Sequence, residues 1–361
     1  MIRIVHVITS FDIGGAEQFV LDLCRRIDRR RFEVAAVVAV VRGGPMRTEF
    51  HEVGIPTEVI GKNSKLGIGA IRRLTADLRS LTPDLVHTHL FGGDTWGRIA
   101  ALRAGVPHLV STEQNTNLDE GAVKRFVKRM LARRTDRIVA VSDAVRSYSI
   151  RVDHIPRGKI AVIPNGVDVE RFRPSPPTPR RGVRFLAVGR FVPQKGLEVL
   201  LDAFAIIRDV LPDATLEIVG DGPLRSTLEA QVHSYHLADR VMFLGFRRDT
   251  AQIYTRADVL VMPSRWEGFG IAAVEAAACG LPVVASAVGG LMEVVVDQET
   301  GILVPPGEPK LLADAMRDLA TDAPRRILFG HAGRRHVEKN YNIRRVVERY
   351  EELYEELVSK A

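Results

Sequence analysis

Two positively charged side chains stand close together near the middle of the chain, in the segment GRFVPQKG. Gly189 follows an apolar run and permits a tight turn, and Arg190 and Lys195 lie just before an expected helix. An arginine can hold two phosphate oxygens, a lysine adds a point charge, and the first N–H groups of a helix also attract anions. The segment therefore predicts a diphosphate site, with an ordinary surface loop of a basic protein as the alternative.

Two glutamates occur among small neighbours in SRWEGFGIAAVEAAACGLPV. Glu267 precedes the turn 268–270, and small residues there let a ligand approach closely, so Glu267 is a candidate contact to sugar hydroxyls and Glu275 to a ribose. A helix cap for Glu267 and a buried partner for Glu275 are the structural alternatives. Glycoside hydrolysis is disfavoured, because eight helical positions span about 12 Å and glycosidase carboxylates lie about 5 to 9.5 Å apart.

The first half of the chain offers weaker candidates. Gly14 and Gly15 precede an expected helix, where backbone N–H groups can face a phosphate or a sugar, although turn formation alone would also explain them. His87 and His89 end an apolar run and lie on one side of a strand, because they are two residues apart. They are candidates for acceptor contact or proton transfer, and structural burial is the equal alternative.

Several nucleotide and metal motifs are absent from the sequence. No Asp-x-Asp pair occurs, so the usual carboxylate clamp for a divalent cation is missing and no metal site is predicted. GDGPLR at 220–225 imitates a dinucleotide fingerprint but ends in arginine and lacks the later acidic residue, which disfavours NAD. P-loop, zinc-protease and serine-hydrolase motifs do not occur. Cys24 and Cys279 lack neighbours at metal or disulfide spacing and are interpreted as packing residues.

Short apolar runs alternate with longer amphipathic stretches along the whole chain. Six runs precede a proline-rich segment, RFRPSPPTPRRG, and six follow it. This alternation predicts parallel sheets with helices on both faces, and the prolines predict an extended linker. The expected fold is α/β, with two Rossmann-like, doubly wound parallel-sheet domains facing a cleft, over residues 1–168 and 169–341, and a final helix over 342–361.

The bulk composition fits a globular protein of two domains. Of the 361 residues, 46% are hydrophobic and 26% charged. The longest apolar run, 34–41, is too short to span a membrane, and the start is typical of a first strand rather than a secretory signal, so we expect a cytoplasmic protein. A net charge of +7 and a pI near 9.6 allow an anionic partner, which charge alone does not identify.

The positive charge is concentrated in the segment 121–137, GAVKRFVKRMLARRTDR. Apolar residues at helical spacing predict an amphipathic helix, which we interpret as a surface helix with its apolar stripe packed inward; docking on an anionic membrane is the alternative. Nucleic acid is not an expected partner, because stacking aromatics beyond Phe126 are lacking. The bases are Lys124, Arg125, Lys128, Arg129, Arg133, Arg134 and Arg137, and the apolar residues are Val123, Phe126, Val127, Met130 and Leu131.

Nine segments, taken in order, resemble the retaining GT-B enzymes of glycosyltransferase family 4. They are GGAE, DLVHTH, VAVSDAVR, IPNGVDVERFRP, GRFVPQKG, GDGP, FLGF, EGFGIAAVEAAACGLPV and GGLMEVVVDQETGILVPP. Their spread means that the resemblance covers nearly the whole chain. The resemblance implies an acceptor-binding first domain, a second domain for the nucleotide-sugar donor, and a final helix that returns to the first domain.

The resemblance also implies roles for single residues. Arg190 and Lys195 match the pair that binds the donor diphosphate and stabilises its departing charge. Glu267 matches the glutamate near the donor sugar, which completes the expected catalytic set, and Glu275 matches the contact to the nucleotide ribose. The other expected donor-binding positions are Gly14, Gly15 and Gly189, the nucleobase region Leu244, Gly245 and Phe246, and the phosphate turn Phe269, Gly270 and Ile271.

One position departs from the family. Members often have histidine two residues after the threonine that ends the fifth strand, whereas this chain has Gln114, which does not titrate. Gln114 is therefore a candidate only for hydrogen bonding to the acceptor or the donor sugar, and we expect a substrate contact there. The resemblance implies that the acceptor hydroxyl attacks the face that the diphosphate leaves, and that a leaving phosphate oxygen takes the proton. Positioning and electrostatic stabilisation then suffice, with no cofactor and no metal.

The implied donor is a nucleotide diphosphate-sugar, with UDP expected and GDP as the alternative. A lipid-linked or saccharide acceptor is expected, in polysaccharide or glycolipid synthesis, which would place the protein on the inner face of the plasma membrane. A non-hydrolysing sugar-nucleotide epimerase lacks this motif order, and the intact charged positions disfavour a non-catalytic sugar-nucleotide binder. Both remain alternatives that product analysis distinguishes.

Overall fold

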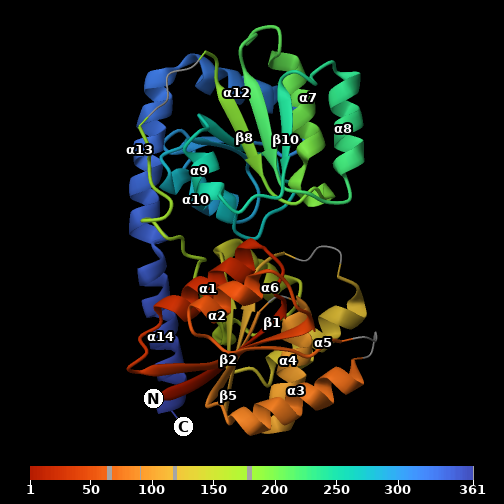
Figure 1. Ribbon diagram of the computed structural model, residues 1–361, viewed down its shortest axis with the longest axis vertical. Coiled ribbons are helices and arrows are strands. Elements are labelled where there is room, and N and C mark those ends of the chain that lie inside the picture. The colour runs from red at the N-terminus through yellow and green to blue at the C-terminus, as the bar shows by residue number, and fades with distance from the viewer. Residues whose placement is uncertain (63–66, 90, 117–119, 177–180, 361) are drawn as a thin grey trace. The chain divides into compact units, whose positions relative to one another are not determined.

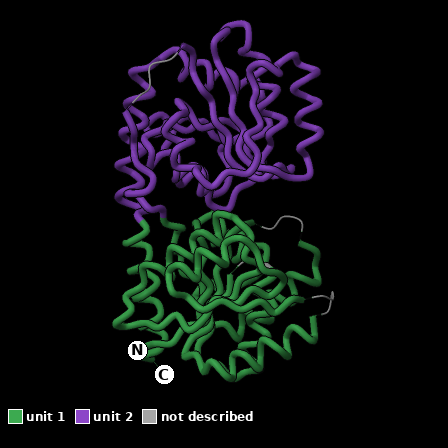
Figure 2. The backbone as a smooth tube through the Cα atoms, viewed as in Figure 1, with its two compact units in different colours: residues 1–166, 343–361 green, residues 167–342 purple. Residues whose placement is uncertain are grey.

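The computed structural model describes residues 1–62, 67–89, 91–116, 120–176 and 181–360. The chain forms two compact units, shown in Figure 2: unit 1 comprises residues 1–166 and 343–361, and unit 2 comprises residues 167–342. The expected boundaries were placed after residues 168 and 341. The prolines Pro177 and Pro179 of the expected linker lie outside the described residues.

Unit 1 is built on a parallel sheet of seven strands in the order β3-β2-β1-β4-β5-β6-β7. The sequence pattern predicted six of them; the last, β7, is a short, half-buried edge strand with a weak apolar signal. The strands are β1 (Ile2–Ser10), β2 (Phe32–Arg42), β3 (Thr57–Val59), β4 (Leu85–His89), β5 (His108–Glu113), β6 (Arg137–Ala140) and β7 (Ile160–Val162).

Helices cover both faces of this sheet, as Figure 1 shows, because alternate residues of each buried strand point to opposite faces. Ile4 packs with α1 and α14, whereas Val5 packs with α3 and α4. Although α14 comes last in the chain, its Tyr350 and Tyr354 are fully buried in unit 1. The helices are α1 (Gly15–Arg26), α2 (Met46–Glu52), α3 (Ile68–Leu81), α4 (Phe91–Ala104), α5 (Ala122–Ala132), α6 (Asp143–Arg151) and α14 (Ile343–Ser359).

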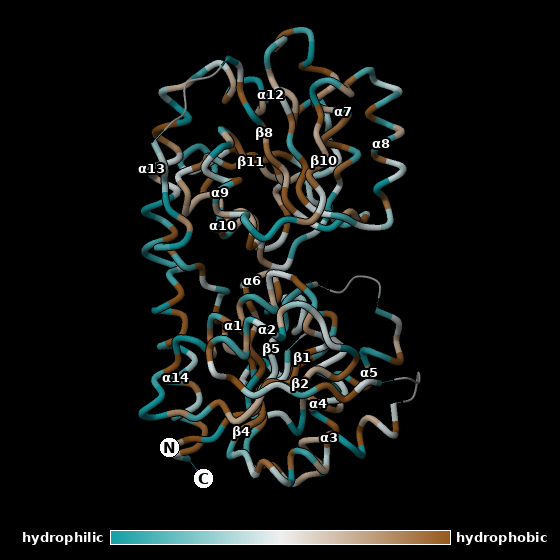
Figure 3. Tube along the Cα trace, viewed as in Figure 1, coloured by the Kyte–Doolittle hydropathy of each residue, from teal (hydrophilic) through white to brown (hydrophobic). Residues whose placement is uncertain are grey.

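Unit 2 repeats the architecture with six parallel strands in the order β10-β9-β8-β11-β12-β13. The six apolar runs after the proline-rich segment correspond to these strands, and Figure 3 shows them as hydrophobic stretches inside the unit. The strands are β8 (Arg184–Val188), β9 (Thr215–Val219), β10 (Val241–Gly245), β11 (Val259–Met262), β12 (Val283–Ser286) and β13 (Gly301–Val304). The helices are α7 (Leu197–Ile207), α8 (Arg225–Ser234), α9 (Thr250–Tyr254), α10 (Ile271–Ala278), α11 (Leu291–Val294), α12 (Pro309–Thr321) and α13 (Ala323–Asn340).

The basic helix is shorter than the sequence pattern predicted. It ends at Ala132 instead of residue 137, because the chain closes a turn there and the backbone N–H of Asp136 donates to Leu109 at the edge of β5. Arg137, assigned to the helix from the pattern, is the first residue of β6. No helix in the described part of the chain is both long and apolar enough to cross a membrane.

Candidate functional site

Loops at the carboxyl ends of the unit 2 strands are joined by close backbone contacts. Gly189 follows β8, and Gly220 follows β9. A Cβ atom on Gly220 would lie 1.9 Å from the carbonyl oxygen of Gly189. A Cβ atom on Gly222 would lie 2.6 Å from the carbonyl oxygen of Phe191. Only glycine fits at these distances, so the GDGP segment, which the dinucleotide comparison left without a role, shapes the GRF loop.

Lys195 ends a short 3₁₀ turn, Pro193–Lys195, that leads into α7. Its stem runs past Gly189, where a Cβ atom would lie 3.4 Å from Cε, and its Nζ lies 2.5 Å from Oε2 of Glu267. The side chain of Gln194 donates to the carbonyl oxygen of Trp266 at 3.1 Å, which ties this turn to the loop after β11. The structure therefore brings together Lys195 and Glu267, which the sequence separates by 72 positions.

Glu267 is held from two sides. Ser264 Oγ lies 3.5 Å from the same carboxylate oxygen that Lys195 contacts. The backbone N–H of Gly290 donates to the carbonyl oxygen of Glu267 at 3.1 Å, and a Cβ atom on Gly289 would lie 1.9 Å from that oxygen. The glycine pair after β12 thus supports the glutamate, a role that its place in the GGLMEVVV segment did not reveal.

Arg190, five residues before Lys195, has an exposed side chain. Within the described residues, its guanidinium forms no hydrogen bond and no ion pair. Because every guanidinium N–H can donate, the group is available to hold an anion bidentately. Strand β8 is therefore followed by Arg190, which is available to an anion, and by Lys195, which is paired with Glu267.

The phosphate turn and the ribose candidate lie around α10. Gly270 precedes the helix with φ +97°, a left-handed conformation that favours glycine, and Ile271 begins the helix with its N–H outside any helical bond. Phe269 is buried against Tyr341, so only its backbone faces a ligand. Tyr254 donates its hydroxyl to Glu275 at 2.9 Å, which matches the paired-partner alternative for that glutamate.

The expected nucleobase region borders the same loops. The backbone N–H of Gly220 donates to the carbonyl oxygen of Gly245 at 2.8 Å, so Leu244, Gly245 and Phe246 lie next to the GDGP segment. The Phe246 side chain is 52% exposed, an accessible aromatic face at the end of β10. Such a surface can stack on a base.

In unit 1, Gly14 and Gly15 lie at the start of α1, where no side chain caps the helix. Gly15 is exposed, but the Glu17 carboxylate folds back to this helix start, where a Cβ atom on Gly14 would lie 2.4 Å from its Oε2. Gly14 has an extended backbone, with φ −161°, which any residue adopts. Both positions therefore remain predictions as ligand contacts.

Gln114 forms a reciprocal amide pair with Asn165. Asn165 donates to Gln114 Oε1 at 2.8 Å, and Gln114 Nε2 lies 3.4 Å from Asn165 Oδ1. Asn165 is buried and Gln114 is half-buried. Sequence reasoning quoted IPNG as a family segment but gave Asn165 no role, because nothing in the sequence links positions 51 residues apart.

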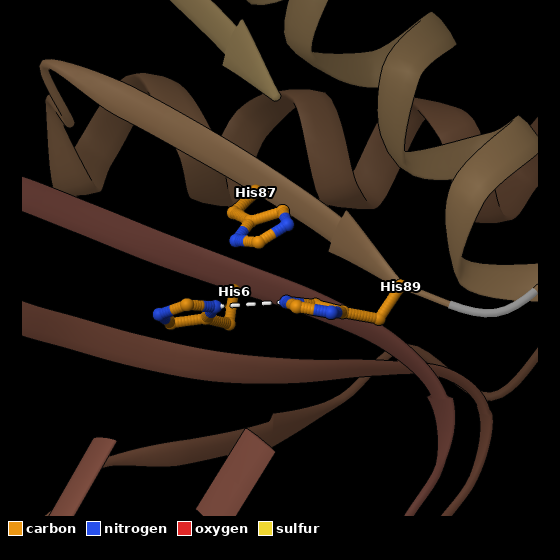
Figure 4. Close-up of side chains that lie close together, drawn as sticks. All are labelled: His6, His87 and His89. Carbon is orange, nitrogen blue, oxygen red and sulfur yellow. Dashed lines mark hydrogen bonds between the residues drawn. The ribbon is translucent and has the colours of Figure 1, made fainter. Parts of the chain in front are cut away.

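His87 and His89 are buried core residues. Figure 4 shows that they lie close to His6, which comes from the neighbouring strand β1. His87 hydrogen-bonds through Nδ1 to Tyr354 and through Nε2 to Thr112, at 2.6 and 2.7 Å. Neither imidazole has exposed surface, so the structure corrects the expectation of acceptor contact in favour of burial. Burial lowers the pKa of both groups well below the usual value, which keeps them neutral.

The three histidines are also the one group of potential metal ligands among the described residues, with ligand atoms within 4.8 Å of one another. His6 Nδ1 and His89 Nε2 are hydrogen-bonded to each other at 3.0 Å. His87 already uses both ring nitrogens, and no carboxylate belongs to the group. We therefore interpret the cluster as a neutral part of the core rather than a metal centre.

The side chains of α5 differ from the expected arrangement, because a lysine is buried and several apolar side chains are exposed. Lys128 is buried, 2.8 Å from Glu113 Oε2 and 2.7 Å from Asp153 Oδ2. Burial alone would lower the pKa of Lys128, but these two carboxylates raise it above the usual value. Three of the five apolar residues that we expected to pack inward are instead exposed: Val123 at 79%, Phe126 at 64% and Met130 at 44%. Leu131 is buried as expected, and Val127 is half-buried. The helix turns a lysine inward because two buried acids require a cation there.

Two family models match the chain. The model described as Glycosyltransferase Family 4 matches residues 13–171, and the model described as Glycosyl transferases group 1 matches residues 168–336. The two regions correspond closely to units 1 and 2.

Similar proteins of known sequence or structure support the same family. The UDP-Gal:alpha-D-GlcNAc-diphosphoundecaprenol alpha-1,3-galactosyltransferase of Escherichia coli is 30% identical over 76% of each chain. The D-inositol 3-phosphate glycosyltransferase of Xylanimonas cellulosilytica is 33% identical over 87% of this chain and 85% of its own. The crystal structure of Anabaena Alr3699/HepE in complex with UDP and glucose superimposes with a TM-score of 0.87 at 25% identity, over 98% of this chain and 99% of that one.

Both units have the doubly wound parallel sheets of these structures, and the family models together run from residue 13 to residue 336. The chain therefore belongs to family 4 of the glycosyltransferases and has the GT-B fold.

Proposed function

We propose that this glycosyltransferase moves a sugar from a UDP-sugar to an acceptor hydroxyl with retention of the anomeric configuration. The observation that carries the proposal is the Lys195–Glu267 pair at the carboxyl end of the unit 2 sheet, with the exposed Arg190 five residues before Lys195 in the loop after β8. Two cations at one strand end suit the two phosphates of a donor, and the carboxylate suits the hydroxyls of its sugar.

The charged groups of this site would act by positioning and by stabilising charge. As the bond between the sugar C1 and the diphosphate breaks, negative charge grows on the phosphate oxygens, where Arg190 and Lys195 would hold it. The acceptor oxygen bonds to C1 on the same face, and its proton passes to a leaving phosphate oxygen. Glu267 keeps Lys195 in place before the donor binds and would then be free to accept from sugar hydroxyls. We propose that these cations make a metal ion unnecessary.

UDP is the proposed nucleotide because of the relatives. HepE was crystallised with UDP and glucose, and the Escherichia coli relative is named for UDP-Gal. That relative is also named for a diphosphoundecaprenol-linked acceptor, which supports a lipid-linked acceptor and a role in surface polysaccharide or glycolipid synthesis. GDP remains the second candidate nucleotide.

A donor screen tests the transferase site. Thermal shift and donor hydrolysis are measured with UDP-, GDP- and ADP-sugars, with and without EDTA, on wild type, Lys195→Ala and a control, Lys310→Ala. Lys310 is exposed on α12 and has no ion pair among the described residues. We expect UDP-sugars to stabilise wild type and Lys310→Ala, and Lys195→Ala to hydrolyse the donor about 100-fold more slowly. Equal loss in Lys310→Ala, or a requirement for metal, would contradict the proposal.

The stereochemical outcome is tested separately. Proton NMR identifies the first anomer released when wild type hydrolyses an α-linked UDP-sugar. We expect the α anomer, whereas the β anomer would show inversion. Recovery of an isomerised donor would instead identify an epimerase, and stabilisation without any product, even with lipid-linked saccharides supplied, would identify a non-catalytic binder.

We further propose that α5 docks on an anionic membrane, which would bring the enzyme to a lipid-linked acceptor. Three apolar side chains are exposed on it, and the exposed cations Lys124, Arg129, Arg133 and Arg134 accompany them. Apolar insertion combined with basic charge favours anionic lipid surfaces. Lys128 is excluded from this surface because it is buried.

Vesicle sedimentation tests the membrane partner. Phosphatidylcholine vesicles are compared with and without phosphatidylglycerol, for wild type, Val123→Ser/Phe126→Ser and the control Leu328→Ser. Leu328 is 63% exposed on α13, so its substitution removes similar apolar area elsewhere. We expect the double variant to bind anionic vesicles at least about tenfold more weakly and the control to match wild type. Absence of wild-type binding would remove the proposal and leave the donor-site proposal untouched.

A further inference from the structure

A hollow of about 310 Å³ lies on unit 1 between α3 and the end of α4. Its wall consists of three arginines and three smaller side chains, and no carboxylate. The lining residues are Ile71, Arg72, Thr75, Ala76, Arg79 and Arg103. The α3 residues recur every three or four positions, so they share one face of that helix.

The three arginines are not neutralised by the protein. Within the described residues, Arg72, Arg79 and Arg103 form no ion pair, whereas Arg26 on α1 pairs with Asp22 at 2.7 Å. One guanidinium is fixed in place, because Arg79 Nη2 donates to the carbonyl oxygen of Arg103 at 2.9 Å. Its other N–H groups remain available to a ligand. Three like charges around one hollow repel each other unless an anion joins them.

Thr75 adds an independent observation. It lines the hollow with 8% of its surface exposed, and its hydroxyl has no hydrogen-bond partner in the described structure. An unmatched buried hydroxyl costs free energy, and a ligand oxygen would satisfy it once the side chain turns towards the hollow. Helix C-termini favour cations such as Arg79 and Arg103 in general, but Arg72 lies in the first half of α3, where this effect does not apply.

The hollow lies away from the predicted ligand edge of unit 1. The C-terminal ends of α3 and α4 lead directly into the first residues of β4 and β5. Gln114 and the start of α1 lie at the opposite, carboxyl ends of strands. A ligand in the hollow would therefore not react there but bind as a second partner.

We propose that this hollow is a binding site for a phosphate-bearing anion. Arg72 and Arg103 would contact phosphoryl oxygens with two N–H groups each, Arg79 would contribute its remaining donors, and Thr75 would donate its hydroxyl. The same chemistry is offered by a free diphosphate and by the headgroup of an anionic phospholipid.

Calorimetric titration with inorganic pyrophosphate tests the site. The titrated protein is the full chain carrying Arg190→Ala and Lys195→Ala, so that the proposed donor site does not contribute. Arg72→Ala/Arg103→Ala and Thr75→Val are compared with a control, Arg335→Ala, which removes one exposed arginine from α13. We expect one site, weakened about tenfold or more by the double arginine change and less by Thr75→Val, with no change in the control.

Vesicles containing phosphatidic acid, compared with phosphatidylcholine alone, provide the second arm. Binding to pyrophosphate but not to vesicles identifies a soluble anion, and vesicle binding that depends on Arg72 and Arg103 identifies a lipid headgroup. The proposal is overturned if pyrophosphate does not bind and vesicle binding does not depend on Arg72 and Arg103. It is also overturned if Arg335→Ala weakens binding as much as the double arginine change. Because Arg72 and Arg103 lie in unit 1, UDP-sugar stabilisation should persist when these two residues alone are changed in the wild-type chain, which separates this result from the donor screen.

Discussion

Unit 2 leaves charged side chains accessible at the carboxyl ends of its strands, whereas unit 1 buries a lysine with two acids and two histidines. Arg190 is exposed, and the Lys195 side chain retains 20% of its surface. In unit 1, Lys128 and its two acids are buried, as are His87 and His89. The two units therefore have similar folds but differ in how exposed their polar side chains are. In unit 2, Arg190 and Lys195 are accessible to a ligand, whereas unit 1 uses its polar groups to fix its own core and its helix α5.

The largest expected effect concerns the buried cation of unit 1. Lys128→Met leaves Glu113 and Asp153 without a partner, so we expect the free energy of unfolding of unit 1 to fall by about 3 to 5 kcal/mol. Urea unfolding is followed through Trp96 in a Trp266→Phe background, because these are the two tryptophans of the chain. Arg129→Met, an exposed neighbour on α5, should change stability by less than about 0.5 kcal/mol. Equal effects of the two changes would mean that the triad does not stabilise the unit.

The second prediction tests whether the unit 2 site depends on backbone contacts. Gly289 and Gly307 both have left-handed backbones, with φ +49° and +78°, but only at Gly289 would a Cβ atom meet another group, Glu267. Gly307→Ala should cost about 1 kcal/mol, and Gly289→Ala about 2 to 4 kcal/mol with loss of donor hydrolysis. Thermal unfolding and the hydrolysis assay measure both. Full hydrolysis by Gly289→Ala would show that Glu267 is not held by this contact.

A smaller effect is expected from pH. Burial lowers the pKa of His6 from 6.5 to about 3, so the folded unit keeps it neutral while the unfolded chain protonates it below pH 6.5. Neutral His6 contributes fully to the stability of the folded unit above pH 6.5. As the pH falls from 6.5 towards 3, the free energy of unfolding decreases by up to about 1.4 kcal/mol per pH unit. Urea unfolding at pH 7 and 5.5, followed through Trp96, should show a larger loss for wild type than for His6→Gln. An equal loss of stability in wild type and His6→Gln would show that His6 does not cause the pH dependence.

The smallest expected effect lies in unit 2. Burial, together with the charge of Glu275, raises the pKa of Tyr254 well above its usual value, so its hydroxyl stays a donor. Tyr254→Phe removes one hydrogen bond and should cost about 1 kcal/mol. If Glu275 also binds the ribose, the variant should bind UDP less well while keeping its donor preference, as measured by calorimetry. Unchanged UDP affinity would favour a purely structural role for the pair.

The sequence by itself determined the fold class and the order of elements. Fully apolar strand runs such as 34–41 and the alternation with amphipathic stretches are local patterns, and they suffice to predict doubly wound parallel sheets. The segments GRFVPQKG and EGFGIAAVE also supplied Lys195 and Glu267, which the structure brings together in an ion pair, and their role as a donor site stays a prediction. The weak edge strand β7 escaped prediction because three half-buried residues carry little periodicity.

Only the tertiary structure decided which side chains face a ligand and which face the core. The pattern of 121–137 predicted an inward apolar stripe, but the buried carboxylates of Glu113 and Asp153, distant in sequence, draw Lys128 inward. The burial of His87 and His89 follows from distant neighbours: Tyr354 of α14 hydrogen-bonds to His87, and His6 of β1 hydrogen-bonds to His89. Side-chain exposure depends on such non-local contacts, whereas sequence periodicity records only neighbours along the chain.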